Sequence, residues 1–214
     1  EYNGGVKALR GVSVRIPRNS MTVIVGCNGA GKTTLAMCIA GLLKPKQGRI
    51  FMDNLRVGLV LQNPDLMLVC DTVWEEACFG ARNLERQKEK LSERIEWILK
   101  RLGLYDKKDL HPHSLSRGQR LRLAVASVVS MLPDILILDE PTMGQDLRSL
   151  SSLFGFLEEM RERGMTIIFI THDLDVALAF SDWMIVMDHG KIVEQGPTQK
   201  IARKEIFEKA GLVI

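Results

Sequence analysis

The sequence lacks the features of disulfide-bonded or zinc-binding proteins, of nucleic-acid-binding proteins and of membrane-spanning proteins. Its four cysteines show no C-x-x-C spacing, which argues against a disulfide scaffold or a zinc site. Basic and acidic residues are mixed along the chain and the net charge is only +3, so we expect no nucleic-acid partner. The most apolar stretch, residues 121–138, is interrupted by polar residues and a proline. A membrane span needs about 20 mostly apolar residues, so we expect a soluble protein or the soluble subunit of a complex.

Short apolar runs alternate with helical patterns along the chain. Strands or hairpins are expected at residues 21–25, 135–138, 165–171 and 183–195. Helices are expected at residues 33–43, 72–103, 116–131 and 146–163, with a short one from residue 198. Residues 48–62 are expected to form two further strands around a turn at Asp53 and Asn54. Strands that alternate with helices predict an α/β fold with a mainly parallel sheet.

Residues 26–34, GCNGAGKTT, fit the phosphate-binding pattern G-x-x-x-x-G-K-[ST]. The stretch follows an apolar strand and opens a helix, which is the context that this motif requires. Its backbone N–H groups and the positive end of the helix dipole favour an anion. Lys32 is expected to reach the β- and γ-phosphates of a bound nucleotide, and the Thr33 hydroxyl to bind Mg²⁺. The full set of expected phosphate-loop contacts is Asn28, Gly29, Ala30, Gly31, Lys32, Thr33 and Thr34.

Three polar residues stand at the ends of two buried apolar runs. In ILILDEP, residues 135–141, Asp139 is expected to reach Mg²⁺. Glu140 is expected to act as the general base that activates water for attack on the γ-phosphate. In MTIIFITHD, residues 165–173, His172 is expected to hydrogen-bond the γ-phosphate and to help position Glu140.

Residues 114–122, SLSRGQRLR, resemble the LSGGQ signature of the ATP-binding cassette (ABC) ATPases. Ser116 and Gln119 also have the spacing of a capping box, and a helix start offers free N–H groups to an anion. The resemblance implies that Ser116, Gly118 and Gln119 bind the γ-phosphate of an ATP held by a second cassette. Arg117 departs from the family's first signature glycine, and we expect its guanidinium to point to solvent or to the partner cassette.

Other motifs of the ABC family follow in their usual order. Gln62, in LVLQNP, resembles the Q-loop glutamine that contacts Mg²⁺ and water. PTMGQD resembles the D-loop, which implies that Asp146 lies at the dimer interface. Tyr2 precedes the phosphate loop at about the distance of the aromatic residue that stacks on adenine.

The resemblance covers nearly the whole chain and implies the fold of the ABC ATPases. That fold is a P-loop NTPase fold with a RecA-like, mainly parallel sheet core, a helical subdomain and a small antiparallel β-subdomain. We expect one domain over residues 1–214, with the core and β-subdomain at about 1–65 and 132–214 and the helical subdomain at about 66–131. Since residues 48–62 are short for the family, the β-subdomain is expected to be trimmed.

Two stretches, QNPD at 62–65 and TVWEEACFGARN at 72–83, resemble the energy-coupling factor branch of importers, which take up vitamins, cobalt or nickel. The resemblance implies an ATPase at the cytoplasmic face of the cell membrane, with ATP and Mg²⁺ as cofactors. It implies three partners: a second ABC ATPase subunit, a transmembrane coupling subunit and a substrate-binding membrane protein. The apolar run 66–69 is expected either to contact the membrane subunit or to be buried in the helical subdomain.

Three alternatives share the phosphate loop. A soluble, non-transport ABC ATPase usually carries large insertions or basic arms, and the sequence has neither. A P-loop kinase needs an arginine-rich lid and has no use for the signature. A cassette kept only for nucleotide binding and regulation would not need Glu140 and His172.

Overall fold

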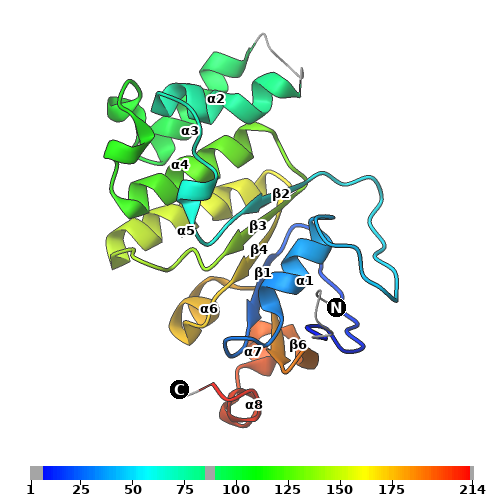
Figure 1. Cartoon of the computed structure of the whole chain (residues 1–214). Coiled ribbons are helices and arrows are strands. Elements are labelled where there is room, and N and C mark those ends of the chain that lie inside the picture. The colour runs from blue at the N-terminus through cyan, green and yellow to red at the C-terminus, as the bar shows by residue number, and fades with distance from the viewer. Residues whose placement is uncertain (1–6, 85–89, 213–214) are drawn as a thin grey trace.

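A computed structural model describes residues 7–84 and 90–212 of the chain, and these residues form a six-stranded sheet covered by helices (Figure 1). The order across the sheet is β2-β3-β4-β1-β5-β6. The strands are β1 (Met21–Val25), β2 (Val57–Val60), β3 (Ile135–Asp139), β4 (Thr166–Ile170), β5 (Trp183–Asp188) and β6 (Lys191–Pro197). Neighbouring strands pair in parallel, except that β6 is antiparallel to β5. The predicted α/β fold with a mainly parallel sheet is confirmed.

Both faces of the sheet are apolar because helices cover both of them. The helices α1 (Lys32–Ile39), α4 (Arg117–Ser130), α5 (Leu147–Glu162) and α6 (Leu174–Phe180) pack on the sheet. Apolar side chains of α1 meet one face, and those of α4, α5 and α6 join the core on the other. Every residue of β1, β3 and β4 is buried, so the carboxyl ends of three adjacent parallel strands lie at one edge.

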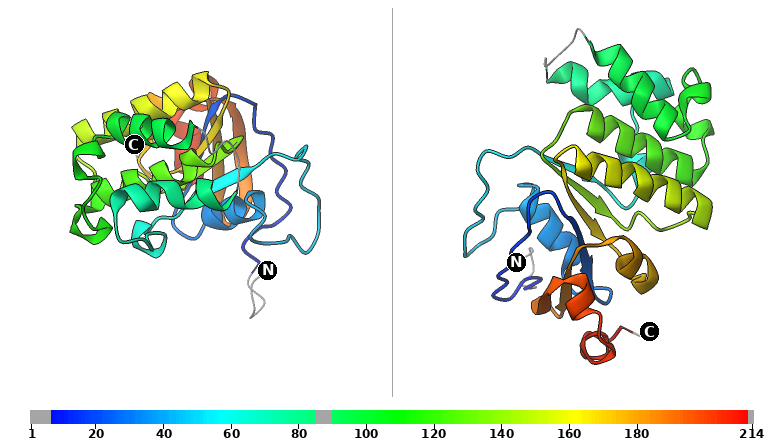
Figure 2. Two further views of the ribbon diagram at one scale, coloured as in Figure 1. Left: turned by 90° about the horizontal axis from the view of Figure 1, so that it is seen from above. Right: turned by 180° about the vertical axis from the view of Figure 1, so that it is seen from behind.

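Two groups of helices lie at opposite ends of the molecule (Figures 1 and 2). The first group contains α2 (Val73–Asn83), α3 (Leu91–Arg101) and α4, preceded by the short 3₁₀ helix η1 (Pro64–Leu66). The second group contains α7 (Thr198–Ile201) and α8 (Lys204–Lys209), which follow β6. No helix within the described ranges has the length and apolar character needed to cross a membrane.

The predicted pair of strands within residues 48–62 is wrong. Only Val57–Val60 forms a strand, and it pairs in parallel with β3 instead of forming a hairpin. The Asp53–Asn54 turn lies in an open loop whose Phe51 side chain is 86% exposed. Alternating apolar residues predict a strand only when a sheet edge or a core covers one face, and Phe51 has no such cover.

Two smaller differences concern helices. The sequence did not indicate α6, which follows β4 directly and is capped by the Asp173 side chain, which accepts a hydrogen bond from Val176 N. The single short helix expected after residue 198 is two helices, α7 and α8. The other expected helices and the hairpin at His189 and Gly190 are present in the described residues.

Gly58 in β2 tests how closely the helical group packs on the sheet. A Cβ atom on Gly58 would lie 2.3 Å from Val128 Cγ1 of α4, so Gly58→Ala forces the Val128 side chain or α4 itself to shift. We expect the substitution to lower the free energy of unfolding by roughly 1–3 kcal/mol, the usual cost of overpacking. Urea denaturation measures this loss.

Gly155→Ala is the matched control, because a Cβ atom there would have no neighbour within 4 Å. Gly155 lies inside α5, where alanine is the better helix former, so this variant is expected to be stabilised by roughly 0.5–1 kcal/mol. Equal stability of the two variants would contradict the close packing of β2 on α4.

Candidate nucleotide-binding site

The loop between β1 and α1 passes close to other backbone segments. A Cβ atom on Gly26 would lie 2.2 Å from Met187 O, and one on Gly31 would lie 2.5 Å from Ala8 O. Both positions therefore require glycine. Gly31 is the N-cap of α1 and has a left-handed φ of 98°, and no side chain caps this helix. The positive end of the helix dipole at this N-terminus therefore favours an anionic ligand such as a phosphate.

Lys32 places a buried cation beside this loop. The residue is only 7% exposed, and its Nζ atom donates hydrogen bonds to Gly26 O at 2.7 Å and Cys27 O at 3.1 Å. Burial lowers the pKa of Lys32, while the nearby charges of Glu140 and Asp139 act in the opposite direction. The ammonium is thus held at the phosphate loop by carbonyl oxygens, which a phosphate would replace with stronger, charge-assisted partners.

Thr33 and Asp139 join the loop to the end of β3. Thr33 Oγ1 donates a hydrogen bond to Asp139 Oδ2 at 2.8 Å. Asp139 is 5% exposed, and its burial raises the pKa of the carboxyl although the Thr33 hydrogen bond and Lys32 lower it. A hydroxyl and a carboxylate oxygen therefore lie side by side, and hard cations such as Mg²⁺ prefer oxygen ligands of this kind.

Glu140 turns away from Asp139 and contacts the end of β4. His172 Nδ1 lies 2.9 Å from Glu140 Oε2. Glu140 has a φ of 50°, and its backbone N–H donates to Ile170 O at 2.9 Å, which holds the residue in this conformation. A positive φ at a residue other than glycine is strained and is often found at active sites. The two neighbouring carboxylates thus have different partners, Thr33 for Asp139 and His172 for Glu140.

Gln62 and Asp146 lie around the loop that follows Glu140. Gln62 Nε2 donates to Met143 Sδ at 3.1 Å, so this side chain contacts that loop. Asp146 caps α5 and accepts hydrogen bonds from Ser149 N at 2.8 Å and Ser149 Oγ at 3.0 Å, which lower the pKa of its carboxyl. Asp146 is exposed, as a residue at a dimer interface has to be in a single chain.

The segment around Ser116 forms the predicted capping box at the start of α4. Gln119 N donates to Ser116 Oγ at 3.3 Å, and Ser116 N donates to Gln119 Oε1 at 3.0 Å. Gly118 lies under Gln145 of the D-loop, whose Nε2 atom donates to Gly118 O at 3.4 Å. A Cβ atom on Gly118 would lie 2.9 Å from Gln145 Oε1, so a larger residue there would displace the Gln145 side chain.

The side chain of Arg117 lies against the D-loop. Arg117 is exposed, and a Cβ atom on Gly144 would lie 3.2 Å from Arg117 Cδ. The sequence did not reveal the contacts of Arg117 and Gln145, because no motif describes packing between two loops 27 residues apart.

The expected site residues form one group around the phosphate loop and a second group at the start of α4, and one residue, Tyr2, belongs to neither. Direct contacts link Thr33 with Asp139 and Glu140 with His172, and the charges of both carboxylates act on Lys32. In the phosphate loop Ala30 is buried, whereas Asn28 and Gly29 are exposed, and Thr34 lies in the first turn of α1. Ser116, Gly118 and Gln119 belong to the helical group. Tyr2 lies outside the described residues.

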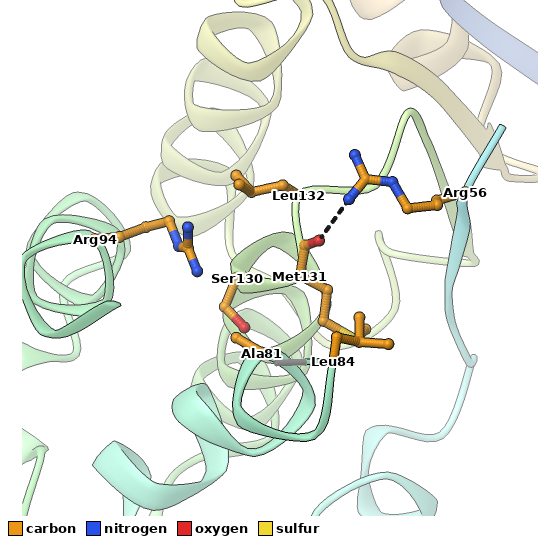
Figure 3. Close-up of a pocket in the computed structure, with 7 residues that line it drawn as sticks. All are labelled: Arg56, Ala81, Leu84, Arg94, Ser130, Met131 and Leu132. Carbon is orange, nitrogen blue, oxygen red and sulfur yellow. Dashed lines mark hydrogen bonds between the residues drawn. The ribbon is translucent and has the colours of Figure 1, made fainter. Parts of the chain in front are cut away.

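A cavity of about 290 Å³ lies at the other edge of the sheet and is separate from the phosphate loop (Figure 3). It lies beside the C-terminal ends of α2 and α4 and the start of β2. Arg56 Nη1 donates to Met131 O at 3.5 Å, and its Nε lies 3.2 Å from Asp134 Oδ2. The Arg56 guanidinium here serves a helix C-terminus and a carboxylate, both of which favour a cation.

The geometry of the phosphate loop, with its buried lysine and the two strand-end carboxylates, defines a P-loop nucleotide-binding protein. The family model described as ABC transporter matches residues 9–143. The chain is 39% identical over 223 residues to the energy-coupling factor transporter ATP-binding protein EcfA of Carboxydothermus hydrogenoformans, covering 99% of this chain and 83% of that protein. It is 40% identical over 227 residues to EcfA3 of Clostridium perfringens, covering 99% and 80%.

A solved structure gives the same result. CbiO1 of Clostridium perfringens, described as part of the ABC transporter complex CbiONQ, matches with a TM-score of 0.84 and 37% identity over 100% of this chain and 92% of that one. The chain therefore belongs to the ATP-binding subunits of ABC transporters, in their energy-coupling factor branch. It is an ATPase that binds ATP.

Asp139→Asn tests whether the buried carboxylate lowers the free energy of unfolding. Burial raises the pKa of Asp139, so the folded chain binds this proton more tightly than the unfolded chain does. Stability is therefore lost as the pH rises through the pKa of the folded state. Without nucleotide or metal, we expect Asp139→Asn to raise the free energy of unfolding at pH 7 by roughly 0.5–2 kcal/mol, the range for relief of functional strain.

Asp134→Asn is the control with the opposite sign, because hydrogen bonds from Arg56 lower the pKa of Asp134. Its stabilisation is present above the ordinary carboxyl pKa and is lost as the pH falls, so this variant is expected to be less stable at pH 7. Urea unfolding from pH 4 to 7 separates the two. A loss of stability in Asp139→Asn would contradict the account of this site.

Proposed function

We propose that this chain powers an importer of the energy-coupling factor type, for vitamins or for cobalt or nickel, through ATP-driven closure of two cassettes. The contact of 2.9 Å between Glu140 and His172, at the strand ends next to Lys32, is the observation that carries the proposal. It joins a carboxylate of a general base to a hydrogen-bond donor for phosphate, which a cassette for nucleotide binding alone does not need.

The residues at the strand ends have roles that follow from their contacts. The phosphate loop and Lys32 bind the triphosphate, and Glu140 accepts the proton of the attacking water. His172 fixes the orientation of the Glu140 carboxylate and donates a hydrogen bond to the γ-phosphate. Glu140 is 8% exposed, so its carboxylate is shielded from bulk water by the surrounding protein.

The pair Thr33–Asp139 fits a Mg²⁺ ion bound together with the nucleotide. Mg²⁺ usually takes one or two carboxylates together with substrate phosphates and water, and the pair supplies one hydroxyl and one carboxylate oxygen. Gln62 is the third expected ligand, and its Nε2 atom donates to Met143 Sδ in this structure. When bound, Mg²⁺ neutralises charge on the β- and γ-phosphates.

Two cassettes would pack head to tail, so that the start of α4 in one faces the phosphate loop of the other. Ser116, Gly118 and Gln119 then grip the γ-phosphate from the side opposite Lys32. Since this grip exists only while the γ-phosphate is present, ATP favours the closed pair and its hydrolysis favours the open one. Asp146 lies at the interface in this arrangement.

Glu140→Gln tests the assigned chemistry. The amide cannot accept the proton of the attacking water, so we expect ATP hydrolysis to fall by roughly 10²–10⁴-fold, the usual contribution of a general base. The affinity for ATP should change little because the phosphate loop and Lys32 remain. Steady-state ATPase assays and equilibrium binding of a fluorescent ATP analogue measure the two quantities.

Glu162→Gln is the control for Glu140→Gln, because Glu162 is exposed at the end of α5. It should hydrolyse ATP at the wild-type rate. Wild-type turnover in Glu140→Gln would show that another group activates the water.

A groove beside α2 is the candidate surface for the membrane subunit. It has a volume of about 300 Å³ and is lined by Val69, Cys70, Asp71, Glu75, Phe79, Arg82 and Asn83. Val69 is 69% exposed and Phe79 is 46% exposed, so the groove presents two apolar side chains to solvent. Beside these apolar side chains lie the carboxylates of Asp71 and Glu75. The groove therefore fits a helical segment with apolar and basic side chains.

One wall of the groove is held by a buried carboxylate. Glu76 is 1% exposed and accepts hydrogen bonds from Val69 N at 2.7 Å and Cys70 N at 2.9 Å. Burial, and to a smaller extent the nearby Glu76 carboxylate, raises the pKa of Cys70 to about 11. The Cys70 thiol therefore stays protonated. Within the run 66–69, Leu66 and Val69 are exposed whereas Leu68 is buried, so Leu66 and Val69 are the side chains of the run that a membrane subunit could contact.

Phe79→Asp tests the groove as the docking surface. A third carboxylate and the loss of the apolar ring should abolish co-purification with the membrane subunits and leave ATP affinity unchanged. Affinity capture from detergent-solubilised membranes, followed by mass spectrometry, measures the association.

Phe51→Asp is the control for Phe79→Asp, because Phe51 is even more exposed but lies in the loop between α1 and β2. It should co-purify as the wild type does. If Phe79→Asp still captured the membrane subunits, the groove would not be their docking surface.

A further inference from the structure

An ion pair connects η1, which precedes the groove in the chain, to the start of α4. Asp65 belongs to η1, next to the exposed Leu66, and its Oδ1 atom lies 2.6 Å from Arg120 Nε. Arg120 lies in the first turns of α4, and its Nη1 atom donates a hydrogen bond to Leu115 O. The same guanidinium therefore contacts η1 and the residue that precedes the Ser116 cap.

The surroundings of this pair restrict its movement. The Arg120 side chain is 20% exposed and that of Asp65 is 40% exposed, so water screens their attraction less than in a pair on the open surface. Pro64 is buried, and η1 packs on α4. The side chain of Asn63 caps η1 by accepting a hydrogen bond from Asp65 N at 3.2 Å. Asp65 is thus carried by a short rigid element.

The position of η1 links two regions that the proposed mechanism uses. On one side the chain continues from η1 to the exposed Val69, which follows Leu66 by three residues and lines the groove. On the other side Gln62, three residues before Asp65, contacts Met143 in the loop after Glu140. A displacement of η1 by an occupant of the groove would therefore move Asp65, and with it the Arg120 guanidinium that holds Leu115 O.

We propose that Asp65 and Arg120 are positioning residues that transmit occupancy of the groove to the signature segment at the start of α4. The proposal rests on the function proposed above, because it takes the membrane subunit as the occupant. Neither residue touches nucleotide in this account. They act through the backbone of Leu115 and Ser116, which orients the residues that grip the γ-phosphate.

The test compares ATPase rates of the cassette alone and in the complex with its membrane subunits. We expect Asp65→Asn, Arg120→Gln and the double variant each to lower the ratio of these rates by about fivefold or more, a typical allosteric coupling. The KM for ATP should stay the same, because the phosphate loop of the same chain is untouched. Asp65→Glu should restore the ratio because it keeps the carboxylate.

A surface ion pair of the same length is the matched control. Lys100 Nζ lies 2.6 Å from Glu96 Oε1 on α3, and both side chains are exposed. Glu96→Gln removes the same charge as Asp65→Asn and should leave the ratio unchanged. A ratio of ATPase rates in Asp65→Asn within about twofold of the wild-type ratio would overturn the proposal. So would a double variant whose ratio is much lower than that of either single variant, because the effects of two residues that act as a pair do not add.

Hydrogen exchange of the chain by itself supplies a second measurement that needs no membrane subunit. The backbone amides of residues 119 and 120 donate hydrogen bonds to Ser116. They should exchange about threefold faster or more in Asp65→Asn and Arg120→Gln, and as in the wild type in Glu96→Gln. Unchanged exchange in both variants would overturn the pair as a positioning element even if no membrane complex assembled.

The failures are distinguishable. If the wild-type chain captures no membrane subunit, the proposed function fails, and the exchange measurement still decides whether the pair holds α4. If the wild-type complex forms and Asp65→Asn alone fails to assemble, Asp65 is a docking residue, which contradicts its role as a positioning residue.

Discussion

The structure depends on a buried cation that lies beside two buried carboxylates at one edge of the sheet. Lys32, Asp139 and Glu140 are each less than a tenth exposed. Removing charges from water costs free energy. This cost is offset here by the carbonyl oxygens that accept hydrogen bonds from Lys32, by the Thr33 hydroxyl and by His172. A cluster of this kind is retained for its chemistry, because an apolar edge would be simpler to stabilise.

The fold brings these groups together through the order of its strands. The phosphate loop follows β1, the two carboxylates follow β3, and His172 follows β4, which lies between β1 and β3 in the sheet. Parallel pairing then brings all three strand ends to the same edge. Glycines at Gly26 and Gly31 let the loop pass close to Met187 O and Ala8 O, so the cation is fixed by backbone packing on both sides.

Sequence patterns predicted the parts of the molecule that a local rule describes. The buried strands β1, β3 and β4, the phosphate loop and the capping box at Ser116 each follow from a short pattern of residues. The strand expected before Asp53 failed because alternation around Phe51 lacked a covering layer, which only the tertiary structure reveals. For the same reason the sequence left the run 66–69 undecided, since the exposure of Leu66 and burial of Leu68 depend on how η1 lies on α4.

Sequence patterns could not predict the contacts between separate motifs. Asp65 contacts Arg120, which lies 55 residues later in the sequence. Gln145 contacts Gly118, which lies 27 residues earlier. No spacing rule relates these residues, because their distance depends on the packing of the helical group against the sheet. They also link separate motifs: the Q-loop with the signature, and the signature with the D-loop.

The central claim is that the γ-phosphate of ATP joins two cassettes, with Lys32 on one side and Ser116 on the other. Light scattering of Glu140→Gln, alone and mixed with a second cassette that co-purifies with it, measures the mass of the particle in each nucleotide directly. The account predicts that the mass doubles with ATP and Mg²⁺ and stays that of a single cassette with ADP. A mass that is the same with both nucleotides would contradict it.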